Sequence, residues 1–160
     1  MKRIGIVAVS LLLLGFISCS SSKQARVVKK TIDGNWQLQT IVTEGITGKV
    51  KVMLFNEADF NCFVGSTWSF NNYNSLGSYT INNTADCATT KRNIRWTIYE
   101  APNEPKLFQF KRLTDKLKDV DDGAGFRFSV VQLDDNSMQL RSSITFEGKP
   151  ASFVYNFVRN

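Results

Sequence analysis

Histidine is absent from this chain of 160 residues. A Cys–His nucleophile pair and the usual zinc ligand sets are therefore excluded. There is also no Gly-x-Ser-x-Gly nucleophile elbow and no glycine-rich loop of the kind that cradles phosphate. The carboxylates gather in expected turns, at Asp119, Asp121, Asp122, Asp134 and Asp135. These absences predict that the protein is not an enzyme and that it holds no metal or cofactor.

Residues 1–19 are organised as an export signal. Lys2 and Arg3 precede an apolar run that is too short to cross a hydrocarbon core of roughly 30 Å. The small residue Ser18 then precedes Cys19. This order resembles a bacterial lipoprotein signal, which implies cleavage before Cys19 and acylation of its thiol. A plain signal peptide at residues 1–18 with an incidental cysteine after it is the alternative.

The chain after the signal divides into two parts. Residues 19–32 are polar and basic without periodicity, which predicts a lipidated, flexible tether to the membrane. Residues 33–160 are long enough for one domain with a single core. No acidic run follows Cys19, in contrast to the surface-export signal of Bacteroidetes lipoproteins. We therefore expect a cell-envelope lipoprotein, held in the outer membrane and facing the periplasm.

Two cysteines remain once Cys19 is assigned to lipid. Cys62 and Cys87 are an even pair in a chain bound for an oxidising compartment, which favours a disulfide between them. Such a bridge closes a loop of about 26 residues and stabilises the fold by about 3.5 kcal/mol in the chain-entropy description.

Alternation of apolar and polar residues recurs along the domain. Runs of this kind lie at residues 36–42, 49–55, 67–70, 77–81, 94–99, 108–110, 126–130, 138–146 and 153–158. A period of two is typical of half-buried strands, and the linking segments are short and rich in turn residues. The sequence therefore predicts an all-β fold, either an antiparallel up-and-down barrel of about eight strands or a sandwich.

Two segments interrupt this rhythm. Residues 56–65 predict a short helical turn capped by Asn56 or Asp59. Residues 114–125 predict a charged loop. Its clustered aspartates are the ligand type that calcium prefers, but their spacing does not fit an EF-hand loop and no glutamate completes it. A solvated turn is therefore favoured.

The domain resembles the lipocalin (calycin) family. Gly34 and Trp36 form a Gly-x-Trp at the start of the first expected strand, and Arg159 ends the last one in a Tyr-x-Phe-x-Arg sequence. With the cysteine-ended signal, this pattern is similar to the lipocalin-like lipoproteins of Bacteroidetes. The resemblance implies that Trp36 closes one end of a barrel and that an arginine packs across it. Arg141 is a second candidate for that arginine. The family's central Thr-Asp-Tyr motif has no counterpart, so its receptor binding is not carried over.

The interior of the barrel is the expected binding site. Small barrels are either filled by side chains or open enough for one small ligand. Aromatic residues at alternating strand positions are expected to line the inner wall, namely Trp68, Phe70, Tyr79, Trp96, Phe108, Phe110, Phe128 and Tyr155. They predict either a packed core or an apolar pocket, in which polar groups such as Thr40, Ser142 or Tyr155 orient a ligand.

Two functions remain open at this point. The first is binding of a small hydrophobic ligand inside the barrel. The second is binding of another envelope protein, as an inhibitor or assembly partner, with a filled barrel and with rim loops at residues 71–75, 82–90 and 113–125. Nucleic-acid binding is not expected despite a formal net charge of +6, because export separates the chain from nucleic acid.

Overall fold

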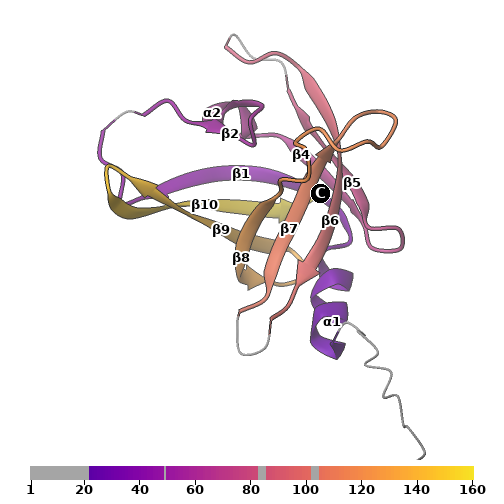
Figure 1. Ribbon diagram of the computed structural model, residues 1–160. Helices are drawn as coiled ribbons and strands as arrows, with labels where there is room; N and C mark the ends of the chain where they lie inside the picture. The colour runs from indigo at the N-terminus through magenta and orange to yellow at the C-terminus, as the bar shows by residue number, and fades with distance from the viewer. Residues whose placement is uncertain (1–21, 49, 83–85, 102–104) are drawn as a thin grey trace, which may run out of the picture.

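A closed barrel of antiparallel strands forms the body of the protein (Figure 1). The computed structural model describes residues 22–48, 50–82, 86–101 and 105–160. Within these ranges eight strands form the barrel, which confirms the predicted fold. The expected signal peptide and the acylation site Cys19 lie outside the described residues. No helix in the described ranges is long and apolar enough to cross a membrane.

The barrel strands follow one another in the order of the sequence. They are β1 (Gly34–Glu44), β4 (Thr67–Asn71), β5 (Leu76–Ile81), β6 (Thr90–Tyr99), β7 (Leu107–Leu113), β8 (Phe126–Leu133), β9 (Ser137–Phe146) and β10 (Lys149–Arg159). β1 pairs with both β4 and β10, and these two ladders close the sheet on itself. Because side chains alternate along a strand, each strand directs one set of side chains inward and the other outward.

A helix, α1 (Lys23–Ile32), covers one end of the barrel. The flexible tether predicted at residues 19–32 is therefore wrong for residues 23–32, and residues 19–21 lie outside the described residues. The Ser22 hydroxyl caps the helix by accepting a hydrogen bond from the amide of Ala25 at 3.2 Å. Ala25, Val28 and Ile32 form a narrow apolar stripe at helical spacing, and Ala25 and Ile32 are buried. That stripe is easily overlooked in the sequence because basic residues surround it.

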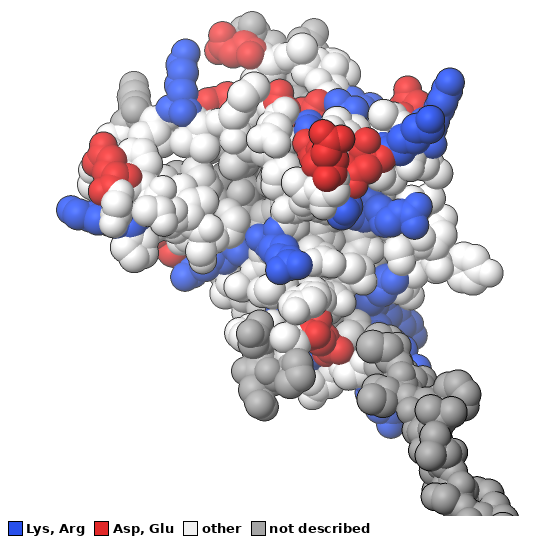
Figure 2. Space-filling view, in the orientation of Figure 1, with Lys and Arg blue, Asp and Glu red and all other residues white. Residues whose placement is uncertain are grey.

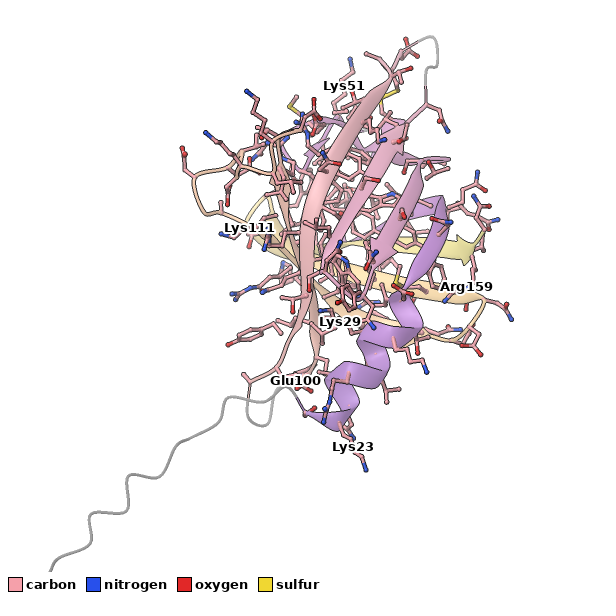
Figure 3. All side chains as sticks on the ribbon, turned by 90° about the vertical axis from the view of Figure 1, so that its right-hand side faces the viewer. Lys23, Lys29, Lys51, Glu100, Lys111 and Arg159 are labelled. Atoms are coloured by element: carbon pink, nitrogen blue, oxygen red, sulfur yellow. A yellow bond between two sulfur atoms is a disulfide. The ribbon has the colours of Figure 1, made fainter. Side chains whose placement is uncertain are left out.

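The segment that joins β1 to β4 covers the opposite end of the barrel, where Figure 3 labels Lys51. We call residues 50–66 the lid. It contains β2 (Met53–Leu54), β3 (Ala58–Asp59) and α2 (Phe60–Phe63). The strand predicted at 49–55 is wrong apart from Met53–Leu54, and these two residues pair with β3 rather than with a barrel strand. Residue 49 lies outside the described residues. The predicted helical turn is confirmed, with Asp59 as its N-cap.

Candidate functional site

Aromatic side chains fill the interior of the barrel. The residues that the sequence predicts to line it are all buried in the core: Trp68, Phe70, Tyr79, Trp96, Phe108, Phe110, Phe128 and Tyr155. Their rings contact one another; the centroids of Trp68 and Tyr79, for example, are 4.7 Å apart. Aromatic pairs of this kind contribute roughly 0.5–1.5 kcal/mol each beyond the burial of their surface. Their part in binding a ligand stays a prediction.

Phe55 lies at the centre of this cluster, and it comes from the lid rather than from a barrel strand. Its ring centroid is 5.0 Å from the nearest aromatic ring and 6.1 Å from the farthest in contact. The rings around it are those of Phe63, Trp68, Phe110, Phe126, Phe128 and Tyr155. Only 6% of Phe55 is exposed. Phe55 is therefore a plug in the lid end of the barrel.

Almost no empty space remains beside the plug. The internal cavity between Phe55 and the strand aromatics has a volume of about 10 Å³. A cavity needs roughly 10–15 Å³ to hold even one water molecule. The barrel is thus closed in this structure, and an internal ligand requires the plug to leave.

The plug is held on a strained backbone. Phe55 and Asn56 have φ angles of 53° and 51°, both in the left-handed region. Bulky residues rarely adopt this conformation, and each residue held there costs roughly 1–3 kcal/mol. Strain of this kind concentrates at ligand clamps and switch segments of proteins. The contacts around the lid must supply the free energy that keeps the plug in place.

Glu57 fastens the lid to the barrel wall. Its carboxylate accepts hydrogen bonds from the Tyr79 hydroxyl at 2.8 Å, from Arg92 at 2.7 and 2.9 Å, and from Arg112 at 2.9 Å. The side chains of Glu57 and Arg112 are only 10% and 6% exposed. We call these four residues, which join the lid to β5, β6 and β7, the latch. Breaking a buried ion pair by removing one partner costs about 3–5 kcal/mol.

At neutral pH the Glu57, Arg92 and Arg112 side chains of the latch are charged, and the Tyr79 phenol is neutral. Burial by itself raises the pKa of Glu57, but the hydrogen bonds from Arg92, Tyr79 and Arg112 outweigh burial and lower the pKa from 4.5 to about 2. Burial and the Glu57 carboxylate raise the pKa of Tyr79 far above its ordinary value, so its phenol stays a hydrogen-bond donor. The pKa of Arg112 is raised as well, first by its hydrogen bond to Asp121.

Asp121 extends the latch into the loop between β7 and β8. Its carboxylate accepts hydrogen bonds from Arg112 Nε at 2.8 Å and Nη2 at 2.5 Å. In the same loop Asp119 pairs with Lys111 at 3.3 Å. The loop predicted at 114–125 is thus present, but these two aspartates are ion-paired rather than simply solvated. Among the residues that the structure describes, no group of three metal-ligating side chains converges.

Cys62 and Cys87 form the disulfide that the sequence predicts. The bridge ties α2 of the lid to the segment between β5 and β6. The lid is therefore attached at two points: by a covalent bond at Cys62, within α2, and by the latch at Glu57, between β2 and β3.

One polar pair lies at the wall of the interior. The hydroxyls of Ser142 and Tyr155 are 3.2 Å apart. Burial raises the pKa of Tyr155 to about 12, against a smaller lowering by the bond to Ser142. Thr40, by contrast, is exposed and accepts a hydrogen bond from Asn156. Its predicted part in orienting an internal ligand is wrong, because its side chain lies on the outer face of β1.

Trp36 and Arg159 seal the end of the barrel beneath α1. Trp36 is completely buried, and its indole nitrogen donates to the carbonyl of Ile32 at 2.8 Å. The Arg159 guanidinium lies 4.3 Å from the centroid of the Trp36 ring. It also donates to the carbonyls of Thr31 and Asp33, at 2.6 and 2.8 Å. One guanidinium thus joins the last strand to α1 and to the start of β1.

Gly34 permits this close approach. Its φ angle is +115°, and a Cβ atom at this position would lie 2.7 Å from a terminal nitrogen of Arg159. A side chain is therefore excluded both by the backbone and by the arginine. Arg141, the other candidate, pairs instead with Glu44 at 3.1 Å. The structure thus assigns the packing across the tryptophan to Arg159.

A closed eight-stranded antiparallel barrel, sealed by a tryptophan in its first strand and an arginine in its last, defines a lipocalin-like protein. A family model described as a lipocalin-like domain matches residues 32–140. The chain belongs to this family.

Similar solved structures include the odorant-binding protein from bovine nasal mucosa, with a TM-score of 0.46 and 10% identity over 88% of this chain and 76% of that one. A complex of bovine odorant-binding protein with a selenium-containing odorant has a TM-score of 0.44 and 10% identity, over 82% and 72% of the two chains. The crystal structure of the bovine protein with its natural ligand has a TM-score of 0.40 and 10% identity, over 88% and 76%. A search of curated proteins finds no match.

Sequence reasoning missed the plug and the latch. Nothing in the residues around Phe55 distinguishes it from any other apolar residue near a strand end. The arginines do carry a signal: Arg92 and Arg112 have the same strand parity as the inward-facing residues Ile94 and Phe110. An inward-facing arginine needs a buried carboxylate partner, because an unpaired buried charge is very costly.

Proposed function

We propose that this protein is a lipid-anchored lipoprotein of the cell envelope whose barrel binds a small apolar molecule in the space that Phe55 now fills. The sequence of residues 1–19 alone supports the anchor and the location in the outer membrane, facing the periplasm. Membership of the lipocalin-like family and the construction of the lid support an internal ligand site.

The observation that carries the proposal is that the plug belongs to the lid. The barrel strands alone leave a central space the size of an aromatic ring, bounded by Trp68, Phe110, Phe128 and Tyr155. Phe55 enters that space from outside. Removal of this one side chain opens the interior without the movement of any barrel strand.

The chemistry of the walls favours a planar, mostly apolar ligand. Aromatic walls offer ring faces and edges, which suit stacked and edge-to-face contacts with another ring. The hydroxyl pair of Ser142 and Tyr155 provides a polar point at which such a ligand is oriented.

Ligand entry requires the lid to withdraw Phe55. The left-handed conformations of Phe55 and Asn56 favour this movement, because their strain of roughly 1–3 kcal/mol per residue is released. Glu57 opposes it through the latch. The balance between strain and latch then sets how readily the barrel opens, while the disulfide keeps α2 in place.

Native mass spectrometry of the full chain, purified from its own membranes, tests the proposal. We expect a small apolar molecule to accompany part of the wild-type protein and a larger part of a Phe55→Ala variant, whose cavity is permanently open. Phe60→Ala is the matched control: Phe60 lies in the same lid but contacts Phe153, and it is not a neighbour of Phe55 in the cluster. Its occupancy should equal that of the wild type.

The filled interior favours a second function, binding of another envelope protein by a barrel that takes no ligand. The observation behind it is the internal volume of only about 10 Å³. Native mass spectrometry of the wild type and of Phe55→Ala also distinguishes ligand binding from protein binding. If neither the wild type nor Phe55→Ala carries a small molecule, and a protein partner is captured instead, the ligand proposal is wrong.

A further inference from the structure

A groove on the outer wall of the barrel is separate from the interior site. It has a volume of about 680 Å³ and lies on the outer face of β6, β7 and β8. The turn between β4 and β5, at Asn74 and Ser75, forms one wall. The loop between β7 and β8, at Gly123 and Gly125, forms the other. Small-molecule sites usually measure about 300–1,000 Å³, so this groove has room for a ligand of metabolite size.

Three basic side chains line the groove: Arg95 from β6, Lys111 from β7 and Arg127 from β8. Arg95 and Lys111 are directly opposite each other in the antiparallel ladder. Like charges in this position destabilise a sheet. Figure 2 shows basic side chains over these strands, with a group of acidic side chains above them. An anion bound in the groove would remove the repulsion between Arg95 and Lys111.

Two of the three basic side chains have N–H donors without a hydrogen-bond partner among the described residues. Within the described residues, Arg95 has no ion pair and no side-chain hydrogen bond. Arg127 stacks on Tyr99 at 4.9 Å and donates its Nε to Gln109 at 3.1 Å, which leaves its terminal nitrogens without a partner in the described part of the chain. Lys111 lies on the outside of the barrel wall, away from α1 (Figure 3), and it forms an ion pair with Asp119.

We propose that this groove binds a small molecule through a phosphate group. A guanidinium offers two parallel N–H donors that match phosphate oxygens, and such charge-assisted bonds are about twice as strong as neutral ones. The phosphate would lie between Arg95 and Lys111, with Arg127 on its other side. Thr97 and Gln109, which also line the groove, would bind the polar remainder of the molecule. A free phosphate ester and the headgroup of an anionic phospholipid share this chemistry.

Calorimetric titration of the full chain in a neutral detergent at low salt tests this site. The probes are glycerol 3-phosphate, a phosphate monoester, and glycerophosphoglycerol, the headgroup of phosphatidylglycerol without its acyl chains. We expect the wild type to bind at least one of them. Arg95→Gln and Arg127→Gln should each weaken binding about tenfold, as the loss of one charge-assisted hydrogen bond implies. Asp119→Asn, which releases Lys111, should tighten it.

Lys91→Gln is the matched control. Lys91 is exposed on the same face of β6 as Arg95, and its substitution removes the same charge, but Lys91 is not part of the groove. Tighter binding of the monoester would identify a free phosphate ester as the ligand class, and tighter binding of the diester would identify a lipid headgroup. The proposal is overturned if neither probe binds, or if Lys91→Gln weakens binding as much as Arg95→Gln does.

Discussion

Replacement of Glu57 by glutamine should destabilise the protein in a way that depends on pH. The hydrogen bonds of the latch lower the pKa of Glu57 from 4.5 to about 2. Each pKa unit is worth 1.36 kcal/mol, so the carboxylate contributes about 3 kcal/mol to the free energy of unfolding at neutral pH. The side chain is only 10% exposed, so solvent screens the latch little. Glu57→Gln should therefore lower the free energy of unfolding by about 3 kcal/mol at pH 7.

The sign of the pH dependence follows from the direction of the shift. A lowered pKa means that the folded state holds its proton less tightly than the unfolded state. The stabilisation is complete above the unfolded pKa of about 4.5 and is lost as the pH falls towards about 2. The difference between the wild type and Glu57→Gln should therefore shrink steadily between about pH 5 and pH 2, because the wild type then protonates the same carboxylate.

Urea unfolding followed by tryptophan fluorescence, with the disulfide intact, measures both effects. Glu44→Gln is the control: Glu44 pairs with Arg141 at 3.1 Å, but its side chain is 47% exposed. Exposed pairs contribute about 1 kcal/mol or less, so this variant should change little. A destabilisation by Glu57→Gln that stayed the same from pH 7 to pH 2 would refute the latch, as would equal effects of the two substitutions.

Two further predictions concern the ends of the barrel. Thiol labelling of unfolded, unreduced protein should find no free thiol at Cys62 or Cys87, and labelling of either residue would show that the bridge is absent. Replacement of both cysteines by serine should lower the free energy of unfolding by about 3.5 kcal/mol. Arg159→Lys should lower it by about 2 kcal/mol, because one ammonium cannot replace both the carbonyl bonds and the stacking on Trp36. Arg26→Lys, at an exposed position of α1, is its control, and an Arg159→Lys variant as stable as this control would contradict the assigned seal.

The barrel could be predicted because the sequence pattern that indicates each strand lies within that strand. A period of two appears in each strand separately, and the same parity assigns Trp68, Phe110 and Tyr155 to the interior. The disulfide followed from the even pair of cysteines in a chain whose sequence predicts export. The seal of Trp36 by Arg159 followed from a resemblance that spans both ends of the domain.

The lid could not be predicted because its structure depends on distant residues. Phe55 has a left-handed backbone that its own sequence does not favour, and the contacts that hold it there come from Arg92 and Arg112, far along the chain. The outer groove could not be predicted either, because it too depends on residues that are distant in the sequence. Parity places Arg95 and Lys111 outside, but only the register of β6 against β7 shows that they are opposite each other.

Helix α1 has a consequence for how an acylated form of the molecule would stand on a membrane. The amide and hydroxyl of Ser22 bond to the Glu100 carboxylate, at 3.2 and 2.7 Å, so the helix begins at a point fixed to the barrel. Cys19 precedes Lys23 by four residues, which span at most about 14 Å. An acylated Cys19 would therefore hold the α1 end close to the bilayer and direct the lid away from it. In that orientation the barrel would open towards the aqueous phase, and an internal ligand would arrive from solution or from a carrier rather than sideways from the lipid.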